Sequence, residues 1–221
     1  MVLSDQEIVK ELLEGNIIIT PMLRAWKKVN NKVSSQIGSS SIDVRLGTEF
    51  RYIKIVKQTH FDLSLPLDKI REQVANYSEV VHVQPMEPFI LHPDDFVLAS
   101  TLEYIKLPPS ITGRLEGRST WGRTGLQVHS TAGFIDPGFE GSLTYELHNM
   151  GKLPLPLFPG IRIGQISFHR MNPAVEVYSK KEGAKYAKTT GTTDALFYED
   201  YEYSIIQKHL EKMKQQHSEE N

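Results

Sequence analysis

Apolar and polar positions follow a helical period at the two ends of this chain and a shorter period between them. Near the start, Ile8 and Leu12 lie on one apolar stripe, which predicts a helix over residues 4–14. Ser4 and Glu7 stand three residues apart, the spacing of a capping box at the start of a helix. The beginning of the chain is therefore expected to fold as a short amphipathic helix.

A second helix is predicted near the other end, from Tyr201 to Gln216. Its apolar face contains Ile205, Ile206, His209, Leu210 and Met213. The opposite face is charged, so this helix is expected to lie at the surface.

Between the two helices the chain has the pattern of an all-β protein. Short runs rich in β-branched and aromatic residues are separated by glycine and proline: Ser41–Leu46, Glu49–Lys57, Val80–Val83, Phe89–Leu91, Phe96–Thr101, Gln127–Ser130, Ser142–His148 and Ile161–Phe168. Many short strands with regular turn signals indicate a sandwich or a jelly-roll-like barrel. Residues 60–79 are more polar and include LDKIREQVANY, which predicts a surface insertion with one short helix.

The predicted strand Ile161–Phe168 changes phase partway along. Ile161 and Ile163 alternate on one face, but the next apolar residues follow in the opposite phase. The slip falls at Gly164-Gln165 and predicts a β-bulge there. A bulge either turns a side chain toward a functional site or forms a barrel corner, and both interpretations remain open.

Length and cysteine content narrow the class of protein. A chain of 221 residues is long enough for one domain with its own core, here expected over residues 1–200 with a helical extension at 201–221. The chain has no cysteine, which excludes disulfides, thiolate zinc sites and cysteine nucleophiles. Catalysis would have to use carboxylates, histidines, hydroxyls, amides, amines or bound metal.

Charge and hydropathy exclude further classes. The formal net charge is -2, so the whole protein does not attract nucleic acid. The acidic start lacks the basic and apolar regions of a signal peptide, and no apolar run approaches the ~20 residues that span a bilayer. A soluble, cytoplasmic protein without nucleic-acid or membrane partners is expected.

Candidate chemistry concentrates between Gly113 and Gly141. The stretch contains three arginines, one acid and two hydroxyls in close succession: Arg114, Arg118, Arg123, Glu116, Ser119 and Thr120. Guanidinium groups and exposed N–H groups are suited to a polyphosphate, but the same composition is typical of a solvated basic turn. The residues alone leave both interpretations open.

The segment GRSTWGRT at 117–124 has the spacing of a phosphate-binding P-loop, with arginine in place of lysine. A true P-loop opens a helix after a strand. Here the chain continues as turn and strand with no helical stripe, so the P-loop interpretation is rejected.

The run Ser142–Asn149 alternates cleanly. Leu143 and Leu147 face one way with Tyr145, so that Glu146 faces the other way. A lone strand glutamate is more often a surface residue than a catalytic one. The eight histidines show no metal-ligand spacing, and His129 and His148 are interpreted as structural.

Taken together, these segments resemble the dCTP deaminases of the trimeric dUTPase superfamily. Six of them follow the family's order: SSSIDVRLG (39–47), FILHPDDFVLASTLE (89–103), GRSTWGR (117–123), HSTAGFIDPGFEG (129–141), TYELHN (144–149) and GKLPLPLFPGIRIGQISF (151–168). One such motif would be weak support, whereas six in order are specific.

The resemblance implies a mostly β, distorted jelly-roll barrel assembled as a homotrimer with active sites shared between subunits. It implies dCTP as substrate and Mg²⁺ bound through the triphosphate, with no protein metal ligand. It places these residues at the substrate: Arg118, Ser119, Thr120, Trp121, Gly122, Arg123, Ala132, Asp136, Thr144, Tyr145, Glu146, Gln165, Tyr178, Lys185 and Thr189. By this likeness the 118–120 loop holds phosphates, Asp136 holds the sugar, residues 144–146 meet the base, and the last three close over the phosphates.

The resemblance also gives Glu146 a catalytic role. Deamination adds water at C4 of cytosine, protonates N3 and expels ammonia, and one carboxylate near the base can move these protons. Arg123 is expected to pair with it, while Ser119 and a carbonyl near Ala132 could hold the water. Zinc deaminases need a His/Cys framework that a chain without cysteine cannot build.

Gly133-Phe134 and Gln165 resemble the bifunctional branch of the family, which also cleaves dUTP to dUMP and diphosphate. A glycine at 133 would leave room for a second water or a shifted backbone. The alternatives are a deaminase that releases dUTP, a plain dUTPase, and a non-catalytic nucleotide-binding trimer. The presence of Ser119, Arg123 and Glu146 argues against the last two.

Overall fold

The computed structural model describes residues 1–22, 28–29, 32–33, 35–54, 57, 59–181 and 183–219. Its helices are α1 (Asp5–Leu13), α2 (Leu67–Tyr77), α3 (Ser119–Gly122) and α4 (Tyr201–Glu219), with 3₁₀ turns η1 (Tyr178–Lys180) and η2 (Phe197–Glu199). Its strands are β1 (Ile18–Thr20), β2 (Lys28–Val29), β3 (Lys32–Val33), β4 (Ser41–Ile53), β5 (Ser78–His82), β6 (Phe89–Leu91), β7 (Phe96–Lys106), β8 (Ile111–Gly117), β9 (Leu126–Gln127), β10 (Phe134–Ile135), β11 (Glu140–Asn149), β12 (Leu155–Leu157) and β13 (Arg162–Arg170).

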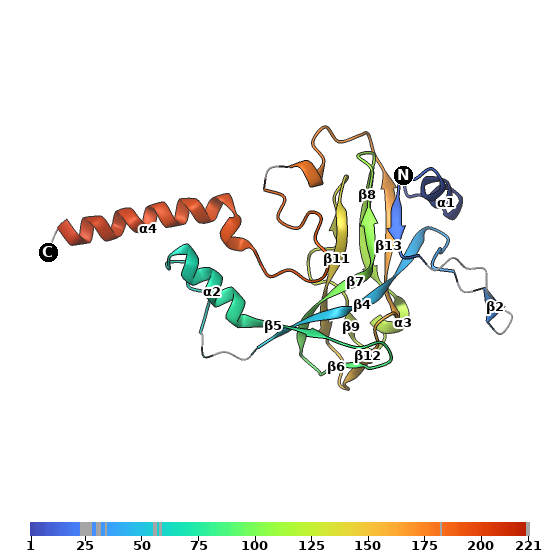
Figure 1. Cartoon of the computed structure of the whole chain (residues 1–221), viewed down its shortest axis with the longest axis horizontal. Coiled ribbons are helices and arrows are strands. Elements are labelled where there is room, and N and C mark those ends of the chain that lie inside the picture. Colours follow the sequence, from blue (N-terminus) through green and yellow to red (C-terminus); the bar gives the residue numbers. More distant parts are fainter. Residues whose placement is uncertain are drawn as a thin grey trace. The chain divides into compact units, whose positions relative to one another are not determined.

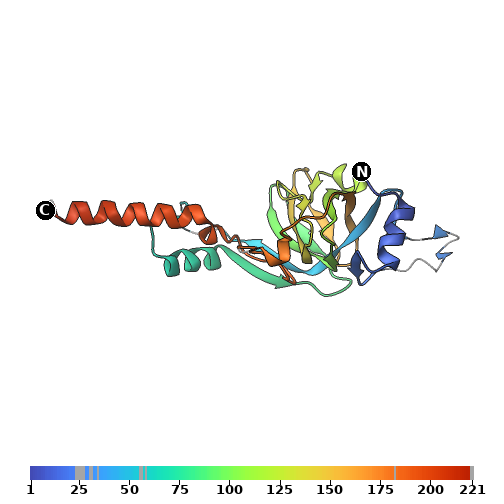
Figure 2. The same ribbon diagram turned by 90° about the horizontal axis from the view of Figure 1, so that it is seen from above.

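The chain divides into two compact units. The larger comprises Met1–Tyr52 and Val80–Thr193, and the smaller comprises Ile53–Glu79 and Asp194–Asn221. In the larger unit the strands follow the order β10-β8-β13-β4-β7-β11-β9, and each of these pairings is antiparallel (Figure 1). Seen from above, the strands of this unit curl around a common interior (Figure 2). The mostly β, curled architecture predicted from the sequence is confirmed.

The interior of the sheet is apolar. Alternate residues of the long strands are fully buried, among them Ile42, Val44, Val97, Ala99, Ile105, Leu147, Ile166 and Phe168. Because side chains alternate across a strand, the polar residues between them face the other side of the sheet. The functional candidates come from that polar side and from the loops at its edges.

Helix α1 begins where the sequence predicts. The Ser4 hydroxyl accepts a hydrogen bond from the Glu7 N–H at 3.4 Å, and the Ser4 N–H donates to the Glu7 carboxylate at 2.9 Å. Ile8 packs in the core, and an ion pair of 2.7 Å joins Glu11 to Arg170 on β13. The capping box and the apolar stripe therefore attach the helix to the sheet.

Two strand predictions are refined. The runs Ser41–Leu46 and Glu49–Lys57 belong largely to a single strand, β4, whose register against β7 shifts between Leu46 and Phe50. Residues 55–56 of the second run lie outside the described residues. The predicted bulge in β13 is confirmed slightly earlier, where the register against β4 shifts between Arg162 and Gly164.

One strand prediction fails, and one long strand was not predicted. The predicted strand over Gln127–Ser130 is wrong, because only Leu126–Gln127 pairs with another strand. The N–H group of Ser130 instead donates a hydrogen bond to the side chain of Glu146. Strand β8 was not predicted, although Ile111 and Leu115 are buried in alternation. Its glycines and charged residues hide this alternation in the sequence.

The smaller unit contains α2, η2 and α4. The ring of Phe61 meets Tyr77 and Phe197 edge-on at centroid distances of 4.9 and 5.5 Å. Tyr203 at the start of α4 donates to the Leu65 carbonyl at 3.3 Å. The insertion and the C-terminal extension thus share one small aromatic core.

None of the helices described is both long and apolar enough to cross a membrane.

Candidate active site

Strand β11 holds the carboxylate of Glu146 on the polar side of the sheet. Its neighbours Tyr145 and Leu147 are fully buried, whereas Glu146 is half-buried, as the alternation predicts. One carboxylate oxygen accepts hydrogen bonds from the N–H groups of Ser130 at 2.7 Å and Thr131 at 3.1 Å. The carboxylate is thereby fixed against the turn that follows residue 128.

That turn belongs to a hairpin that strand β8 secures. Strand β10 pairs with β8 at Phe134 and Ile135, and the Leu115 N–H donates to the Gly133 carbonyl at 2.7 Å. The Thr112 hydroxyl donates to the Ile135 carbonyl at 2.6 Å. The hairpin is therefore anchored directly beside the two N–H groups that hold Glu146.

Gly133 lies in a tight place in this hairpin. A methyl group there would stand 3.0 Å from the Leu115 carbonyl oxygen and 3.0 Å from the His129 ring. The structure accounts for glycine by this close approach, and the predicted room for a second water or a shifted backbone stays a prediction. Phe134 beside it is 66% exposed.

The loop after β8 presents the predicted phosphate-binding residues. It makes a single helical turn, α3, with Ser119, Thr120 and Arg123 exposed and Trp121 partly buried against the core. A strand does precede this turn, but the turn ends after four residues. A turn this short does not open the helix of a P-loop, so that interpretation stays rejected. The single helical turn itself was not expected from the sequence.

Contacts connect this loop to Glu146. A methyl group at Gly117, the residue before Arg118, would stand 3.5 Å from the Val128 side chain. The Val128 carbonyl in turn accepts a hydrogen bond from the Glu146 N–H at 3.0 Å. The base of the loop and the carboxylate are thus separated by one packed residue.

Arg118 and Gln165 lie at the base of the loop. Arg118 makes an ion pair of 3.2 Å with Asp43 and donates to the Arg162 carbonyl at 3.2 Å. Gln165 on β13 donates to the Gly117 carbonyl at 3.4 Å. Both side chains are therefore near the loop, as the resemblance implies.

Other residues predicted to bind the substrate make no recorded contact with the Glu146 carboxylate in the part of the chain that the structure describes. Among the residues with described positions, no ion pair or hydrogen bond links Arg123 to Glu146. Ala132 and Asp136 are exposed on the hairpin, and Thr144 is half-buried two residues before Glu146. The expected pairing of Arg123 with the carboxylate stays a prediction.

Tyr145 requires a correction to its predicted place at the substrate. Its side chain is fully buried and faces the core, so only its main chain can face a ligand. Burial, reinforced by the charges of Glu103 and Asp43, raises the pKa of Tyr145 well above its ordinary value of 10.0.

The C-terminal segment, here residues 178–181 and 183–192, lies along the hairpin and the start of β11. The Tyr178 N–H donates to the Pro137 carbonyl at 3.1 Å, and the Ser142 N–H donates to the Thr189 carbonyl at 2.9 Å. Burial and the nearby charge of Asp136 raise the pKa of Tyr178. Lys185 lies between these two anchored residues in the chain.

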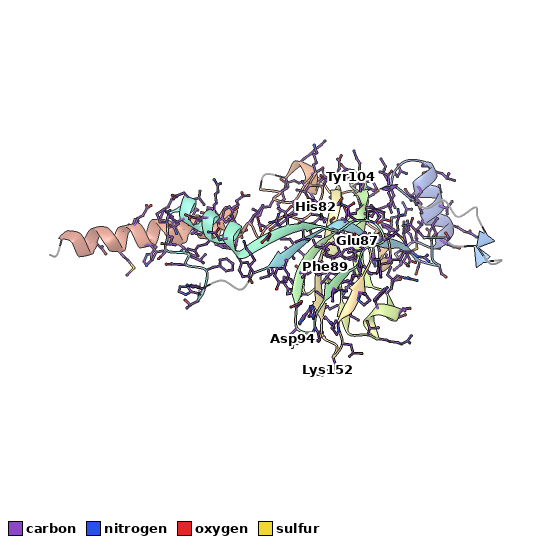
Figure 3. The ribbon with its side chains drawn as sticks, turned by 60° about the horizontal axis from the view of Figure 1, so that its bottom comes forward. His82, Glu87, Phe89, Asp94, Tyr104 and Lys152 are labelled. Atoms are coloured by element: carbon purple, nitrogen blue, oxygen red, sulfur yellow. The ribbon has the colours of Figure 1, made fainter. Side chains whose placement is uncertain are left out.

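Beside this segment Glu140 accepts a hydrogen bond from Tyr104, which Figure 3 labels, at 2.8 Å and pairs with Lys106 at 3.4 Å. The hydrogen bond from Tyr104 is the main factor that lowers the pKa of Glu140. Glu140 on β11 is thus held by two residues of the adjacent strand β7.

Two acidic residues that the structure pairs with arginines were missed from the sequence. Asp43 joins Arg118 and Arg162, and the buried Glu103 pairs with Arg45 at 2.6 Å. The motifs SSSIDVRLG and FILHPDDFVLASTLE contain the two acids, but nothing in either motif shows which cation each one meets. Among the described residues, no three histidine, aspartate or glutamate side chains are grouped to hold a metal.

Comparisons with known proteins place this arrangement in a family. A family model described as dCTP deaminase-like matches residues 2–171. A dCTP deaminase, dUMP-forming, from Methanosphaera stadtmanae is 41% identical over 203 residues, which cover 91% of this chain and 96% of that protein. One of the same name from Dictyoglomus thermophilum is 39% identical over 194 residues, 87% of this chain and 93% of that protein.

A solved structure supports the fold. The 2'-deoxycytidine 5'-triphosphate deaminase from Agrobacterium tumefaciens superposes with a TM-score of 0.56 at 17% identity. The match covers 81% of this chain and 49% of that one, so this chain spans about half of its length. With the family model and the relatives covered almost end to end, the chain belongs to the dCTP deaminase-like family.

Proposed function

We propose that this protein deaminates dCTP at C4 of cytosine and then hydrolyses the dUTP formed to dUMP and diphosphate. The name shared by the Methanosphaera and Dictyoglomus relatives supports this, because both are matched over more than nine tenths of their length. The observation that carries the proposal is the carboxylate of Glu146, fixed by the N–H groups of Ser130 and Thr131, while Val128 lies between the Glu146 main chain and the base of the exposed loop that contains Ser119 and Arg123.

Glu146 is the proposed acid–base group. The hydrogen bonds from Ser130 and Thr131 reach the same carboxylate oxygen, Oε2. The second carboxylate oxygen can take a proton from a water molecule while the oxygen of that water attacks C4. The same carboxylate oxygen can then pass protons to N3 and to the leaving amino group. The C4–N bond breaks, ammonia leaves, and the carbonyl of uracil remains.

The phosphates are assigned to the loop after β8. Arg118 offers a guanidinium already oriented by protein oxygens, and the exposed hydroxyls of Ser119 and Thr120 offer donors beside it. Arg123, with Trp121 and Gly122 before it, completes the turn. Ser119 and a carbonyl near Ala132 are proposed to hold the attacking water.

The nucleoside is assigned to the hairpin and β11. Asp136 is proposed to bind the sugar, and Thr144 and Glu146 to face the base together with the main chain of Tyr145. The C-terminal segment, with Tyr178, Lys185 and Thr189, is proposed to close over the phosphates, since its ends are anchored to the hairpin and to β11.

The second activity is assigned to Gly133, Phe134 and Gln165. Gly133 permits the close packing on His129, and Phe134 is exposed next to it. Mg²⁺ is proposed to arrive on the triphosphate, where it neutralises phosphate charge. The working form is proposed to be a homotrimer whose sites combine two subunits.

Glu146→Gln tests the deamination. This change keeps the shape of the side chain but removes its ability to move protons, so ammonia release from dCTP should fall by at least about 10²–10⁴-fold. Glu87→Gln, a change at an exposed glutamate of a turn, is the control and should keep full activity (Figure 3). Full activity in Glu146→Gln would show that Glu146 is not the acid–base group of the deamination.

A product assay tests the second step. After incubation of the wild-type protein with magnesium dCTP, dUMP and diphosphate should form together with ammonia. Accumulation of dUTP without dUMP would restrict the function to deamination. Formation of dUMP from dUTP without ammonia from dCTP would restrict it to dUTP hydrolysis.

A further inference from the structure

Three acidic or amide side chains form a row across the polar side of the sheet. In the order β4-β13-β8, Asp43 is the register partner of Gln165, and Gln165 is the register partner of Glu116 (Figure 1). Register partners on adjacent strands point to the same face. Asp43 therefore shares the face on which Gln165 contacts the base of the phosphate loop.

Asp43 bridges two arginines. One carboxylate oxygen lies 3.2 Å from Nε of Arg118, and the other lies 3.2 Å from Nη1 of Arg162. The Asp43 side chain is 17% exposed, against 32% for Arg118 and 29% for Arg162. The acid is thus the most buried of the three charges, and it lies beneath the two guanidinium groups.

Arg118 is fixed from two directions. The Asp43 carboxylate on β4 makes an ion pair with its Nε, and the Arg162 carbonyl on β13 accepts a hydrogen bond from its Nη1 at 3.2 Å. A guanidinium has five N–H donors in a rigid plane, so most of them remain for other acceptors. A long side chain held in one orientation before the ligand arrives loses less freedom on binding.

The charges also favour an anion. Two guanidinium groups face one carboxylate, which leaves one net positive charge beside the exposed hydroxyls of Ser119 and Thr120. Arg162 is held in its turn by the Ser35 carbonyl at 2.8 Å. Arg162 therefore offsets the repulsion that Asp43 alone would exert on a phosphate.

We propose that Asp43 is a positioning residue for triphosphate binding, which acts by holding the Arg118 guanidinium in its binding orientation. The inference rests on the proposed function, because it takes the loop after β8 as the phosphate site. Asp43 does not contact the substrate and takes no part in proton transfer. Its effect should therefore appear in substrate binding and disappear when Arg118 is absent.

A double-mutant cycle tests this. Asp43→Asn should raise the KM for magnesium dCTP about tenfold, because it removes the partly buried ion pair that orients Arg118, while kcat changes much less. In an Arg118→Ala background the same Asp43→Asn change should alter KM by less than about twofold, because coupled residues are not additive. Asp43→Glu should restore part of the wild-type KM.

Two outcomes would overturn the proposal. Equal factors in both backgrounds would show that Asp43 acts on the fold and not through Arg118. A lower KM in Asp43→Asn would show that its charge merely weakens phosphate binding. If Asp43→Asn fails to fold, Asp43→Glu replaces it in the same cycle, because glutamate keeps the charge but changes its distance from Arg118; its effect on KM should likewise vanish in the Arg118→Ala background.

Binding of inorganic triphosphate with Mg²⁺ separates this test from the proposed function. If the wild-type protein does not turn over dCTP, the proposed function fails. The dissociation constants of triphosphate for the wild type, the two single variants and the double variant still form the same cycle. Non-additivity there supports the Asp43–Arg118 coupling, and additivity refutes it.

Discussion

At the scale of single residues, the phenol of Tyr145 is an unusual feature of the strand that presents Glu146. Its hydroxyl is buried and has no hydrogen-bond partner among the described residues. A methyl group at Gly164 would stand 2.9 Å from the Tyr145 ring and 3.0 Å from its hydroxyl oxygen. The glycine on β13 therefore makes room for the ring, and the ring supports β11 directly beside Glu146.

Tyr145 should make the stability of the protein sensitive to high pH. Below pH 10.0 the phenol is protonated in both the folded and the unfolded chain, so its titration does not lower the free energy of unfolding there. Above that pH the unfolded chain loses the proton while the buried phenol keeps it, because burial raises its pKa, and stability falls by up to ~1.4 kcal/mol per pH unit.

Denaturant unfolding of wild type and Tyr145→Phe at neutral pH and above pH 10.0 measures this effect. The variant should lose less stability over that range, since it lacks the phenol while the other tyrosines are unchanged. Parallel curves for the two proteins would contradict the predicted titration.

At the scale of elements, helix α1 and the C-terminal segment are each fixed by a few polar contacts at their ends. α1 depends on its capping box and on Glu11, whereas the C-terminal segment depends on Glu49. The Thr192 N–H and hydroxyl both donate to one oxygen of Glu49, each at 2.6 Å. Such contacts decide where an element docks, more than its own propensity does.

Ser4→Ala should destabilise the protein by about 1 kcal/mol, the usual cost of losing an N-cap. Because Ile8 of the same helix is buried in the core, the loss should appear in the global free energy of unfolding measured in urea. Gln6→Ala changes an exposed residue of the same turn and should alter that free energy far less. Equal losses in both variants would argue against the cap.

Thr192→Val tests the anchor at Glu49. Valine keeps the shape and the main-chain N–H donor but lacks the hydroxyl that also donates to Glu49, so we expect a loss of about 1.5–3 kcal/mol, as for one hydrogen bond to a charged group. Thr190→Val removes an exposed hydroxyl and serves as the control. The readouts are urea unfolding and the rate of proteolysis between residues 178 and 192. Cleavage rates that match in the two variants would rule out the anchor.

At the scale of the whole molecule, much of the fold was predictable from local pattern. Alternation placed Glu146 and Leu147 on opposite faces of the sheet. The spacing of Ser4 and Glu7 indicated the start of a helix, and the phase change near Gly164 indicated a bulge. Each of these signals depends only on neighbours in the chain. Strand β8 was missed because it gives a weak local signal and is stabilised by pairing on both sides.

The candidate site was less predictable for a physical reason. The contact of Asp43 with Arg118 joins strands separated by β13, so it exists only once the sheet has formed. The burial of Tyr145 was visible in the alternation, but the resemblance alone placed the residue at the substrate. Local pattern gives the face of a side chain, whereas partners across the sheet need the assembled structure.

The proposed trimer gives a whole-molecule prediction. Sedimentation equilibrium at micromolar concentration should yield three times the chain mass of 25.1 kDa. Glu146→Gln should sediment in the same way, since its change is confined to a side chain on the polar side of the sheet. A mass equal to one chain, together with full activity, would refute a site that combines subunits.

The anchoring of the C-terminal segment at both ends has a kinetic consequence. Tyr178 is tied to Pro137, and Thr189 is tied to Ser142, so Lys185 lies in a loop with fixed ends. A tethered loop searches a small volume, which gives Lys185 a high effective concentration at any ligand beside the hairpin. Closure over a bound nucleotide would then be an intramolecular step whose rate does not depend on protein concentration.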